Sequence, residues 1–589
     1  MNSLTKMILL LALVFSGSNL PAAGAGTTPA CSAADRAALL GFKASILKDT
    51  TGTLSTWTAT DCCGSWAGVG CHPTTGRVTR LELQRPLGGP AGAGLFMEGV
   101  LSPSLGNLDS LEVLVISGMK RIRGAIPDGF SRLRNLTQLY LEGNSLEGAI
   151  PSGLGELPLL KALSLSGNRL RGRLPPSLGS LTSLVQINFG SNLLTGPVPL
   201  SFRNLRDLQY LDISNNFLSG AIPGFLGLFQ GIRLLDLSNN QFSGEIPASL
   251  CGLRNALDVS LSHNRLTGRI PLQIGSLRSL NTLSLSGNLL TGPIPDSIAG
   301  LRKLWYLNVS RNGITGPLPG AIATGLPSLL SVDLSYNRLD LGSIPAWARD
   351  RPLRDVHLAG CNIGGNLPSF NNGDSLSSLD LSDNYLVGEI GHILKNTSAL
   401  QELKLSGNML RSDVSELTLP ETLSTLDLHS NRLYGSLLRF LPRIGGFMEI
   451  LNLANNRISG GLPEFGEDLS LRWLDLSRNA ITGVIPTSVS KLRNLERLDF
   501  SRNQIKGTIP SSMGEMTNLR WLDVSSNSLE GRIPETFLRI RGMQHANFRS
   551  NRLCGQIPQG RPFNIFPASA YVHNLCLCGK PLAPCKHIA

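Results

Sequence analysis

Apolar residues recur along this chain in a repeated unit of about 24 residues. The unit from Leu208 to Gly231 begins with the frame L-x-x-L-x-L, which predicts a short strand with one apolar face. Asn216 follows this strand, and the segment L-x-G-x-I-P after it predicts a turn toward the opposite side. The next unit begins directly afterwards, at Ile232.

The asparagine at the end of the strand shows the repeat best. Two less regular units, around Leu81 and Leu111, precede the first regular unit. Because one unit cannot bury its apolar face alone, we expect stacked units to pair their strands in parallel and share one core. The asparagine amide can donate twice and accept, which would satisfy backbone groups in the turn. We therefore interpret this ladder as architecture. Its positions are Asn144, Asn168, Asn192, Asn216, Asn240, Asn264, Asn288, Asn312, Asn337, Cys361, Asn384, Asn408, Asn431, Asn456, Asn479, Asn503, Asn527 and Asn551.

The first 25 residues are typical of a secretory signal, with Lys6 ahead of an apolar run too short to span a bilayer. Ala25 ends a segment of small residues suited to cleavage, although Ala23 offers a competing site. No later stretch has about 18 uninterrupted apolar residues, so we expect no membrane anchor in the mature chain. We also expect no kinase domain after Cys585.

The chain has 589 residues and a formal net charge of +12, without any block of lysine and arginine that accounts for the charge. One interpretation is a scattered, solvated surface. The other is attraction to an acidic partner or an acidic polysaccharide. A secreted chain without a nucleic-acid-binding motif makes nucleic acid an improbable ligand.

The ten cysteines fall into two terminal clusters and two interior positions, Cys251 and Cys361. Terminal clusters in a secreted chain indicate disulfides that seal the ends of the solenoid, and no zinc-finger spacing supports a metal site. We predict that the interior pair are buried free thiols. The clusters are Cys31, Cys62, Cys63 and Cys71 before the repeats, and Cys554, Cys576, Cys578 and Cys585 after them.

The segment before the repeats predicts a helix that begins with a capping box formed by Ser32 and Asp35. Trp57 and Trp66 flank the adjacent cysteines and are expected to pack there. The glycine-rich segment between Leu87 and Leu95 lacks a strand-to-helix setting, so we interpret it as a loop and not as a phosphate cradle.

Together these motifs resemble the plant-type extracellular leucine-rich repeats, whose unit reads LxxLxLSxNxLxGxIP. The segment DCCGSWAGVGC from Asp61 to Cys71 resembles their N-terminal cap, and the ending LCGQIPQG…HNLCLCGKPLAPC closely resembles that of polygalacturonase-inhibiting proteins. Receptor-like proteins match the length of the chain better. The resemblance implies the disulfides Cys31–Cys62, Cys63–Cys71, Cys554–Cys576 and Cys578–Cys585.

The fold that this resemblance implies is an α/β solenoid, a right-handed superhelix of about twenty repeats with disulfide-stapled caps. We expect a signal peptide at residues 1–25, an N-terminal cap at 26–77, the solenoid at 78–553 and a C-terminal cap at 554–589. About twenty strands at roughly 4.8 Å spacing would form a concave arc on the order of 95 Å. Such an arc suits a protein, a peptide or a polymer better than a small substrate.

An acidic residue often lies between the last two frame leucines, on the outward face of the strand. Eight such carboxylates suggest acid–base pairs or a cation site. We prefer a structural interpretation, because catalysis needs carboxylates in contrasting environments and a uniform column offers none. The eight are Asp212, Asp236, Asp333, Asp380, Asp427, Asp475, Asp499 and Asp523.

A neighbouring column carries aromatic and basic residues in three successive repeats, and these residue types anchor interfaces and hold carboxylates or sugar rings. Packing of each tryptophan against the arginine beside it is the alternative interpretation. A second cluster includes Arg311. The predicted ligand-binding residues are Arg472, Trp473, Glu496, Arg497, Arg520 and Trp521, with Trp305 and Tyr306 in the second cluster.

Three glycosylation sequons begin at Asn135, Asn308 and Asn396, and a glycan on Asn308 would block the middle of the arc. No catalytic motif is present, and we interpret His357 and His429 as surface residues. We expect no enzyme activity, cofactor or metal.

The sequence therefore predicts a secreted recognition module of the plant apoplast or cell wall that acts in defence, similar to a polygalacturonase inhibitor. Its ligand would be a protein or peptide, such as a microbial polygalacturonase, or an acidic wall polysaccharide. The alternative is a soluble receptor-like protein that signals with a membrane receptor kinase. A third hypothesis is a structural wall protein held by charge.

Overall fold

The computed structural model describes residues 30–58, 60–85, 94–394 and 396–585 of the chain. The predicted signal peptide and most of the glycine-rich loop lie outside the described residues. The structure divides into two compact units, Met1–Leu184 and Val185–Ala589, which are described separately.

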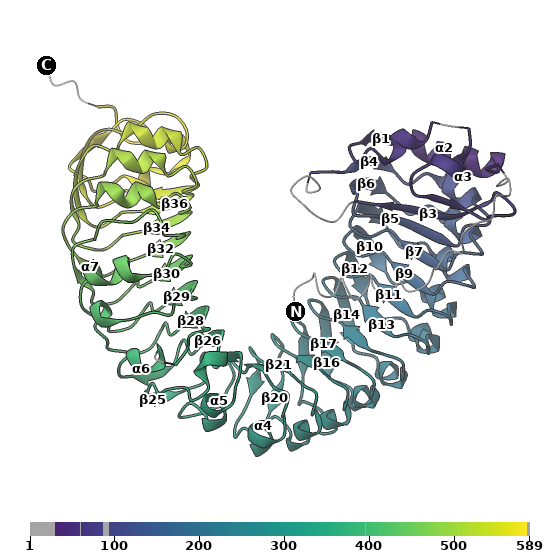
Figure 1. Cartoon of the computed structure of the whole chain (residues 1–589), viewed down its shortest axis with the longest axis horizontal. Coiled ribbons are helices and arrows are strands. Elements are labelled where there is room, and N and C mark those ends of the chain that lie inside the picture. The colour runs from purple at the N-terminus through teal and green to yellow at the C-terminus, as the bar shows by residue number, and fades with distance from the viewer. Residues whose placement is uncertain (1–29, 59, 86–93, 395, 586–589) are drawn as a thin grey trace. The chain divides into compact units, whose positions relative to one another are not determined.

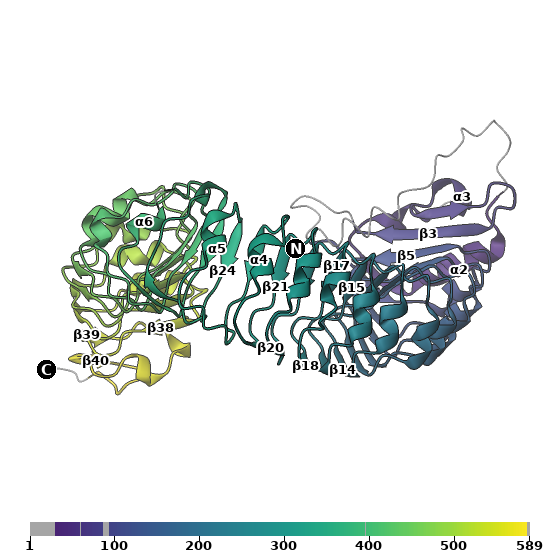
Figure 2. The same cartoon turned by 90° about the horizontal axis from the view of Figure 1, so that it is seen from below.

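Unit 1 opens with a capping helix and stacks the first repeats against it. Its main sheet pairs β2 antiparallel with β3, and then β3, β5, β7 and β9 in parallel (Figures 1 and 2). A second sheet pairs β1 antiparallel with β4, followed by β6, β8 and β10 in parallel. The elements are α2 (Ala33–Ala44), β1 (Ile46–Asp49), α3 (Cys62–Ser65), β2 (Val69–Cys71), β3 (Val78–Gln84), β4 (Met97–Val100), β5 (Val113–Ser117), β6 (Lys120–Gly124), β7 (Gln138–Tyr140), β8 (Ser145–Gly148), β9 (Ala162–Ser164) and β10 (Arg169–Arg173).

Unit 2 has a long main sheet whose short strands are all parallel to their neighbours and in register from repeat to repeat. Figure 1 shows its later strands side by side, with α6 and α7 on the opposite side of the same repeats. The strands are β11 (Gln186–Asn188), β13 (Tyr210–Asp212), β15 (Leu234–Asp236), β17 (Asp258–Ser260), β19 (Thr282–Ser284), β21 (Tyr306–Asn308), β23 (Ser331–Asp333), β24 (Asp355–His357), β26 (Ser378–Asp380), β28 (Glu402–Lys404), β29 (Thr425–Asp427), β30 (Ile450–Asn452), β32 (Trp473–Asp475), β34 (Arg497–Asp499), β36 (Trp521–Asp523) and β38 (His545–Asn547).

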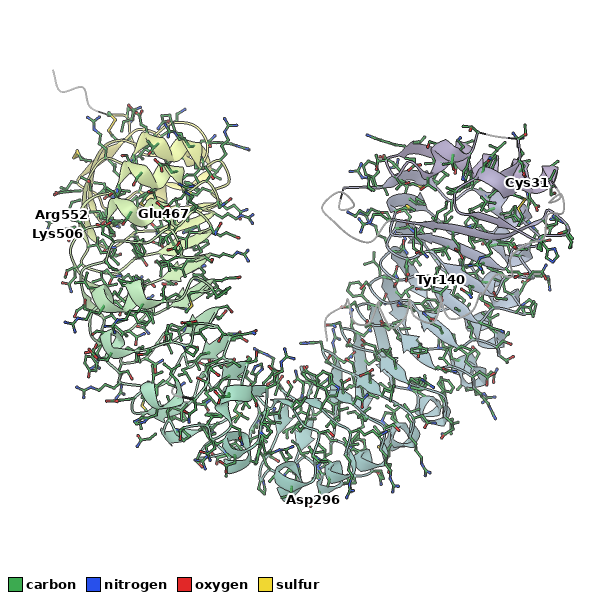
Figure 3. All side chains as sticks on the ribbon, in the orientation of Figure 1. Cys31, Tyr140, Asp296, Glu467, Lys506 and Arg552 are labelled. Atoms are coloured by element: carbon green, nitrogen blue, oxygen red, sulfur yellow. A yellow bond between two sulfur atoms is a disulfide. The ribbon has the colours of Figure 1, made fainter. Side chains whose placement is uncertain are left out.

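A second set of short strands in unit 2 follows the ladder asparagines, and brief helices occupy the far side of most repeats. Most 3₁₀ helices start after the proline of the I-P motif, as Gly224–Leu228 does after Pro223, and Asp296 begins another one on this outer side (Figure 3). The second set is β12 (Leu193–Gly196), β14 (Phe217–Ala221), β16 (Gln241–Glu245), β18 (Arg265–Thr267), β20 (Thr291–Gly292), β22 (Gly313–Ile314), β25 (Gly364–Asn366), β27 (Tyr385–Val387), β31 (Ser459–Gly460), β33 (Ala480–Ile481), β35 (Lys506–Thr508), β37 (Ser528–Gly531), β39 (Arg552–Gln556) and β40 (Cys576–Cys578). The α-helices are α4 (Gly320–Thr324), α5 (Ala346–Asp350), α6 (Gly391–Leu394) and α7 (Leu437–Phe440).

The asparagine ladder holds successive repeats together, as its chemistry predicts. The Asn216 amide nitrogen donates to Ile213 O in its own turn at 3.2 Å and to Phe189 O of the preceding repeat at 3.0 Å. Its Oδ1 accepts the backbone N–H of Leu194 at 2.9 Å. The ladder asparagines therefore bond backbone groups of two repeats, and the structural interpretation of the ladder is confirmed.

Cys361 occupies one ladder position, and its sulfur lies 3.5 Å from the carbonyl oxygens of Leu334 and Ala359. Cys251 and Cys361 are both buried and free, as predicted. Burial raises the pKa of the Cys251 thiol to about 11 and that of Cys361 to about 12, so both stay protonated.

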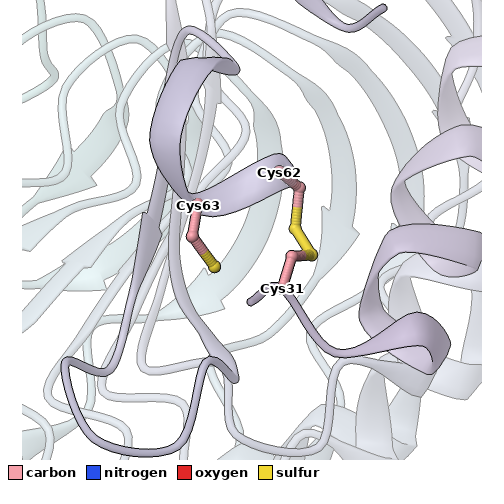
Figure 4. Close-up of side chains that lie close together, drawn as sticks. All are labelled: Cys31, Cys62 and Cys63. Carbon is pink, nitrogen blue, oxygen red and sulfur yellow. A yellow bond between two sulfur atoms is a disulfide. The ribbon is translucent and has the colours of Figure 1, made fainter. Parts of the chain in front are cut away.

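Both ends of the chain carry disulfide-bonded caps, in the pairs that the resemblance implies. Three cysteine sulfurs gather in the N-terminal cap, but Cys31 and Cys62 form one disulfide and Cys63 is bonded to Cys71 (Figure 4). No thiolate of this group is therefore left for a metal. The C-terminal cap contains Cys554–Cys576 and Cys578–Cys585.

The predicted capping box at the first helix is wrong. Ser32 is the N-cap residue of α2, but its side chain makes no capping hydrogen bond. Asp35 is fully buried and accepts from Arg77 Nε at 2.9 Å and from the backbone N–H of Val78 at 2.8 Å. The carboxylate turns inward because a buried charge needs a partner, and Arg77 supplies one at the start of β3.

The two tryptophans of the cap pack as predicted. Trp57 and Trp66 stack with ring centroids 5.1 Å apart, and both are almost fully buried. The Trp57 indole N–H donates to the carbonyl of Ala67 at 3.0 Å. Within the described residues, no helix has the length and apolar character needed to cross a membrane.

Candidate ligand-binding face

The outward face of the last strands of unit 2 brings the predicted binding residues together. In β32, Leu474 is fully buried, so Trp473 and Asp475 point to the other side. Parallel pairing in register aligns Trp473 with Arg497 on β34 and Trp521 on β36. The next strand, β38, adds His545 to the same row.

These four side chains form one continuous stack, called here the tryptophan column (Trp473, Arg497, Trp521 and His545). The Arg497 guanidinium carbon lies 4.8 Å from the Trp473 ring centroid and 4.6 Å from that of Trp521. The His545 ring stacks on Trp521 with centroids 3.6 Å apart. The arginine is thus held between two aromatic faces, which is the packing that the alternative interpretation describes.

The tryptophan column leaves four of its nitrogens buried without a hydrogen-bond partner. They are Trp473 Nε1, Arg497 Nε, Trp521 Nε1 and His545 Nε2. A buried polar group without a partner costs about 1–3 kcal/mol, whereas Arg497 Nη2 lies 3.9 Å from Asp475 Oδ2. Burial lowers the pKa of His545, and the nearby charge of Arg497 acts in the same direction.

A row of charged residues precedes the column on the same strands. Arg472 donates to Glu496 Oε1 from Nε at 3.0 Å and from Nη2 at 2.6 Å. Arg520 Nη1 lies 4.0 Å from the other oxygen of Glu496. Hydrogen bonding from Arg472 lowers the pKa of Glu496. These side chains line an open hollow of about 540 Å³ whose wall also includes Glu449 and Asn518.

The eight aspartates form structural turns and not a catalytic column. In each of them Oδ1 accepts the backbone N–H of the residue two positions later, as Asp475 does from Ser477 at 3.0 Å. Asparagine performs the same task at Asn188 and Asn452, so the slot does not require a charge. Burial, together with the charge of Asp475, raises the pKa of Asp499 to about 6.

The residues of the second predicted cluster, Trp305, Tyr306 and Arg311, do not form one continuous stack. The Trp305 and Tyr306 rings lie 5.9 Å apart, and the Tyr306 hydroxyl accepts from Asn308 Nδ2 at 3.1 Å. Arg311 lies over the ring of Tyr336, 4.6 Å from its centroid. Tyr336 in turn donates to Asp383 Oδ2 at 2.7 Å, a contact that the sequence did not predict because 47 residues separate the partners.

The two histidines that the sequence singled out belong to polar networks on the strand face. His357 Nε2 lies 2.9 Å from Ser378 Oγ, and this hydroxyl donates to Glu402 at 2.8 Å. His429 Nδ1 lies 2.7 Å from Asp427 Oδ1, and this hydrogen bond raises the pKa of the imidazole. Both histidines are half-buried.

The three sequon asparagines differ in exposure. Asn135 and Asn396 are exposed, whereas Asn308 is half-buried on β21 with its Oδ1 accepting from Ser310. Glycosylation at these positions stays a prediction.

Known protein families match both the N-terminal cap and the repeats of the chain. Leucine rich repeat models match residues 109–170, 207–229, 231–253, 254–314, 447–469 and 469–529. The leucine rich repeat N-terminal domain matches residues 32–72.

Relatives among characterised proteins match over part of the chain. A stretch of 121 residues is 36% identical to the DNA damage-repair/toleration protein DRT100 of Arabidopsis thaliana, covering 20% of this chain and 32% of that protein. A stretch of 149 residues is 33% identical to Receptor-like protein EIX1 of Solanum lycopersicum, covering 24% of this chain and 14% of that protein. The matched stretch thus spans about a third of the first relative and less of the second.

Two solved ectodomains are similar over most of the chain. The ectodomain of the membrane receptor kinase GASSHO1/SCHENGEN3 from Arabidopsis thaliana, in complex with CASPARIAN STRIP INTEGRITY FACTOR 2, is 32% identical with a TM-score of 0.72. The similarity covers 89% of this chain and 62% of that one. The ectodomain of the Arabidopsis receptor kinase HAESA, in complex with an IDA peptide hormone, is 29% identical with a TM-score of 0.57, covering 94% and 99%.

The chain is therefore a plant-type leucine-rich-repeat protein with an N-terminal cap, built as a solenoid around a long parallel sheet. It resembles the ectodomains of plant leucine-rich-repeat receptors.

Proposed function

We propose that the chain is a secreted recognition protein that captures an extended peptide or protein segment on the outward face of β32, β34, β36 and β38. The observation that carries this proposal is the tryptophan column, in which four buried nitrogens lack partners beside a hollow lined by Arg472 and Arg520. Aromatic and arginine side chains on an open face are the residues that dominate binding energy in interfaces.

The similar receptor ectodomains support a peptide ligand, because the structures of GASSHO1/SCHENGEN3 and HAESA contain CASPARIAN STRIP INTEGRITY FACTOR 2 and an IDA peptide hormone. The proposed domain limits are those expected from the sequence, with the signal at 1–25 and caps at 26–77 and 554–589. Trp305 and Tyr306 are a secondary contact area in this proposal, and the protein is proposed to act in the apoplast or cell wall without a cofactor.

Three further candidate functions each have a specific observation in their favour. The similarity of the end caps to polygalacturonase-inhibiting proteins favours inhibition of a microbial polygalacturonase in defence. The structure of HAESA with IDA and the co-receptor SERK1 favours a soluble receptor-like role beside a membrane receptor kinase. The excess of basic residues favours retention on an acidic wall polysaccharide.

The proposal predicts that Trp473→Ala, Arg497→Ala and Trp521→Ala together abolish capture of the peptide or protein ligand. A matched control is the variant Leu234→Ala, Asp258→Ala and Thr282→Ala, which changes the same strand position on β15, β17 and β19 and should bind normally. A milder variant, Arg497→Gln, keeps both rings and should weaken capture at least about tenfold. Melting curves of all four proteins check that each variant is folded.

The secreted chain and these variants would be titrated with fungal polygalacturonases, the IDA peptide and CASPARIAN STRIP INTEGRITY FACTOR 2, with isothermal calorimetry and an inhibition assay as readouts. Saturable inhibition that is lost in the triple variant would identify an enzyme inhibitor, and peptide binding lost in the same variant would identify a receptor-like protein. Binding that is the same in the triple variant and in its control would contradict the proposed site.

Fractionation of plant tissue would separate the modes of action. Free recovery from apoplastic fluid favours an inhibitor, detergent-dependent recovery with a kinase favours the receptor-like role, and release by salt alone favours retention by charge.

A further inference from the structure

The second sheet of unit 1 exposes a row of arginines that the sequence did not reveal as a cluster. On β6, Arg121 and Arg123 are exposed while Ile122 between them is fully buried. On β10, Arg169 and Arg171 are exposed on either side of the buried Leu170, and Arg173 continues the same alternation. The five side chains therefore point to one side of the sheet, here called the arginine face.

The pairing of the strands brings these residues close together. β6 pairs with β8 and β8 pairs with β10, all in parallel. Strands lie about 4.8 Å apart and alternate side chains about 7 Å apart along a strand, and the registers place Arg169 one such step beyond Arg123. The five arginine positions therefore form a diagonal strip about 10 Å wide and about 28 Å long. Residues more than 40 positions apart in sequence thus form one charged surface.

Three of the five arginines, those of β10, have no ion-pair partner among the described residues. Glu98 on β4 lies 3.4 Å from Arg121 and 3.9 Å from Arg123. Glu147 on β8 is exposed opposite Arg169 in the register, but no ion pair within 4.0 Å joins them. Among the ion pairs of the described residues, none includes Arg169, Arg171 or Arg173. The face is therefore strongly positive over β10.

The fold does not require arginine at these positions. The three positions of β10 correspond to Phe217, Ser219 and Ala221 on β14, and to Gln241, Ser243 and Glu245 on β16. Small, polar, apolar and acidic residues all occupy the same outward slots of the repeat. A ligand explains three arginines on one strand better than packing does.

The side chains around these arginines limit the chemical classes of ligand that the surface could bind. The outward residues of β6, β8 and β10 are arginine, serine and glutamate, and the nearby Phe96 ring is covered by Arg121 at 3.8 Å. No free aromatic ring of these strands can stack on a nucleobase, and none can insert into a lipid surface. Guanidinium groups hold carboxylates through paired hydrogen bonds, so a flat strip of arginines fits a linear chain of carboxylates.

We propose that the arginine face binds a linear acidic polysaccharide through its uronate carboxylates, which deepens the candidate function of retention on an acidic wall polysaccharide by assigning it to these five residues. This surface belongs to the second sheet of unit 1, whereas the proposed peptide site lies on the main sheet of unit 2. The two proposals can therefore fail independently.

The test uses the full-length secreted protein and polygalacturonate of defined length, with binding measured by biolayer interferometry over a range of salt concentrations. The test variant is Arg169→Gln, Arg171→Ser and Arg173→Ala, which introduces residues that occupy the same slots on β16 and β14. The control is Arg254→Gln, Arg278→Gln and Arg302→Gln, which removes the same charge from three exposed arginines that follow 3₁₀ helices of unit 2.

We expect wild-type protein to bind polygalacturonate with an affinity that falls as salt rises. The test variant should lose at least about tenfold in affinity, and the control should lose less than about threefold. This difference is expected because paired hydrogen bonds to carboxylates contribute more to binding than the net charge of the protein does. The variant Arg169→Lys, Arg171→Lys and Arg173→Lys should show an intermediate loss, because lysine keeps the charge without the paired geometry.

Equal losses of affinity in the test and control variants would overturn the proposal, since they would show that net charge alone accounts for binding. Preference for a sulfated polymer, for anionic phosphatidylserine vesicles or for single-stranded DNA over polygalacturonate would overturn it as well. Retained binding to fully methyl-esterified polygalacturonate would show that the carboxylates are not recognised.

Discussion

At the scale of single residues, the ladder asparagines carry more of the architecture than any other side chain. Each one bonds its own turn and the preceding repeat, as Asn216 does with Ile213 and Phe189. The 24-residue period and the hydrogen-bonding capacity of an amide are sufficient to predict this role. The partner atoms in the neighbouring repeat cannot be predicted in this way, because they depend on how the turns stack.

Asn216→Ala should destabilise its two repeats by about 1–3 kcal/mol, because it leaves the buried N–H of Leu194 without a partner, whereas the carbonyls of Phe189 and Ile213 keep Asn192 and Asn240 as donors. Hydrogen exchange of residues 186–236 would measure the loss. Asn255→Ala is the matched control, since the exposed Asn255 amide makes a hydrogen bond to Gln230 O and should cost about 0–1 kcal/mol. Equal protection in the two variants would contradict the role of the ladder.

Asp499 is a buried aspartate that lies between Asp475 and Asp523 in the same row of carboxylates. Its pKa is raised to about 6 in the folded chain, from an ordinary value of 3.8. The folded state therefore binds this proton more tightly, so the contribution of Asp499 to stability is fully present below about pH 4 and is lost as the pH rises through about 6.

Asp499→Asn should stabilise the fold at pH 7 by about 1–3 kcal/mol, because the shift of roughly two pKa units costs up to about 1.4 kcal/mol per unit. Asparagine can still accept the N–H of Ser501, as it accepts the equivalent N–H at Asn452. The melting temperature should rise by a few degrees at pH 7 and stay unchanged at pH 4. A change of the same size at both pH values would show that ionisation is not the cause.

At the scale of elements, an ion pair between the buried Asp35 and Arg77 joins α2 to the residue that directly precedes β3 in the N-terminal cap. The acid at the third position of a helix pattern usually indicates a capping box, and the sequence predicts one at Asp35. The structure uses this carboxylate to meet Arg77, which is 42 residues away. Local patterns cannot reveal a partner at that distance.

Arg77→Ala should destabilise the cap by about 2–4 kcal/mol, because it leaves the buried Asp35 carboxylate with a single backbone donor. Limited proteolysis of residues 30–85 would report the opening of the cap. The control is Arg80→Ala, which removes a largely exposed pair with Glu82 and should cost about 0–1 kcal/mol. Equal protease resistance of Arg77→Ala and wild type would contradict this account.

The repeat period predicts part of the tryptophan column but not all of it. The fixed spacing of the repeats is enough to predict that Trp473, Arg497 and Trp521 lie in one row. It does not predict His545, because this repeat has Ala546 in place of a frame leucine and so gives a weak signal. The stacking order and the unpartnered nitrogens depend on side-chain conformations, which spacing alone cannot specify.

At the scale of the whole molecule, the arrangement of charge is the feature that the sequence predicts least. The sequence shows no basic block, and yet the second sheet of unit 1 gathers five arginines because strands with alternating side chains stack at a fixed spacing. The described part of the chain divides into two compact units built from the same repeat. Contacts in a solenoid connect neighbouring repeats, so its compactness is a local property.

The central claim is that a plant-type solenoid captures a peptide or protein segment on the outward face of β32 to β38. The most direct test is selection of a displayed random peptide library against the secreted protein, the tryptophan-column triple variant and its control on β15, β17 and β19. The account predicts that peptides enriched on wild type also bind the control and lose at least about tenfold in affinity for the triple variant. Enriched peptides that bind all three proteins equally would contradict the claim and place recognition on another surface.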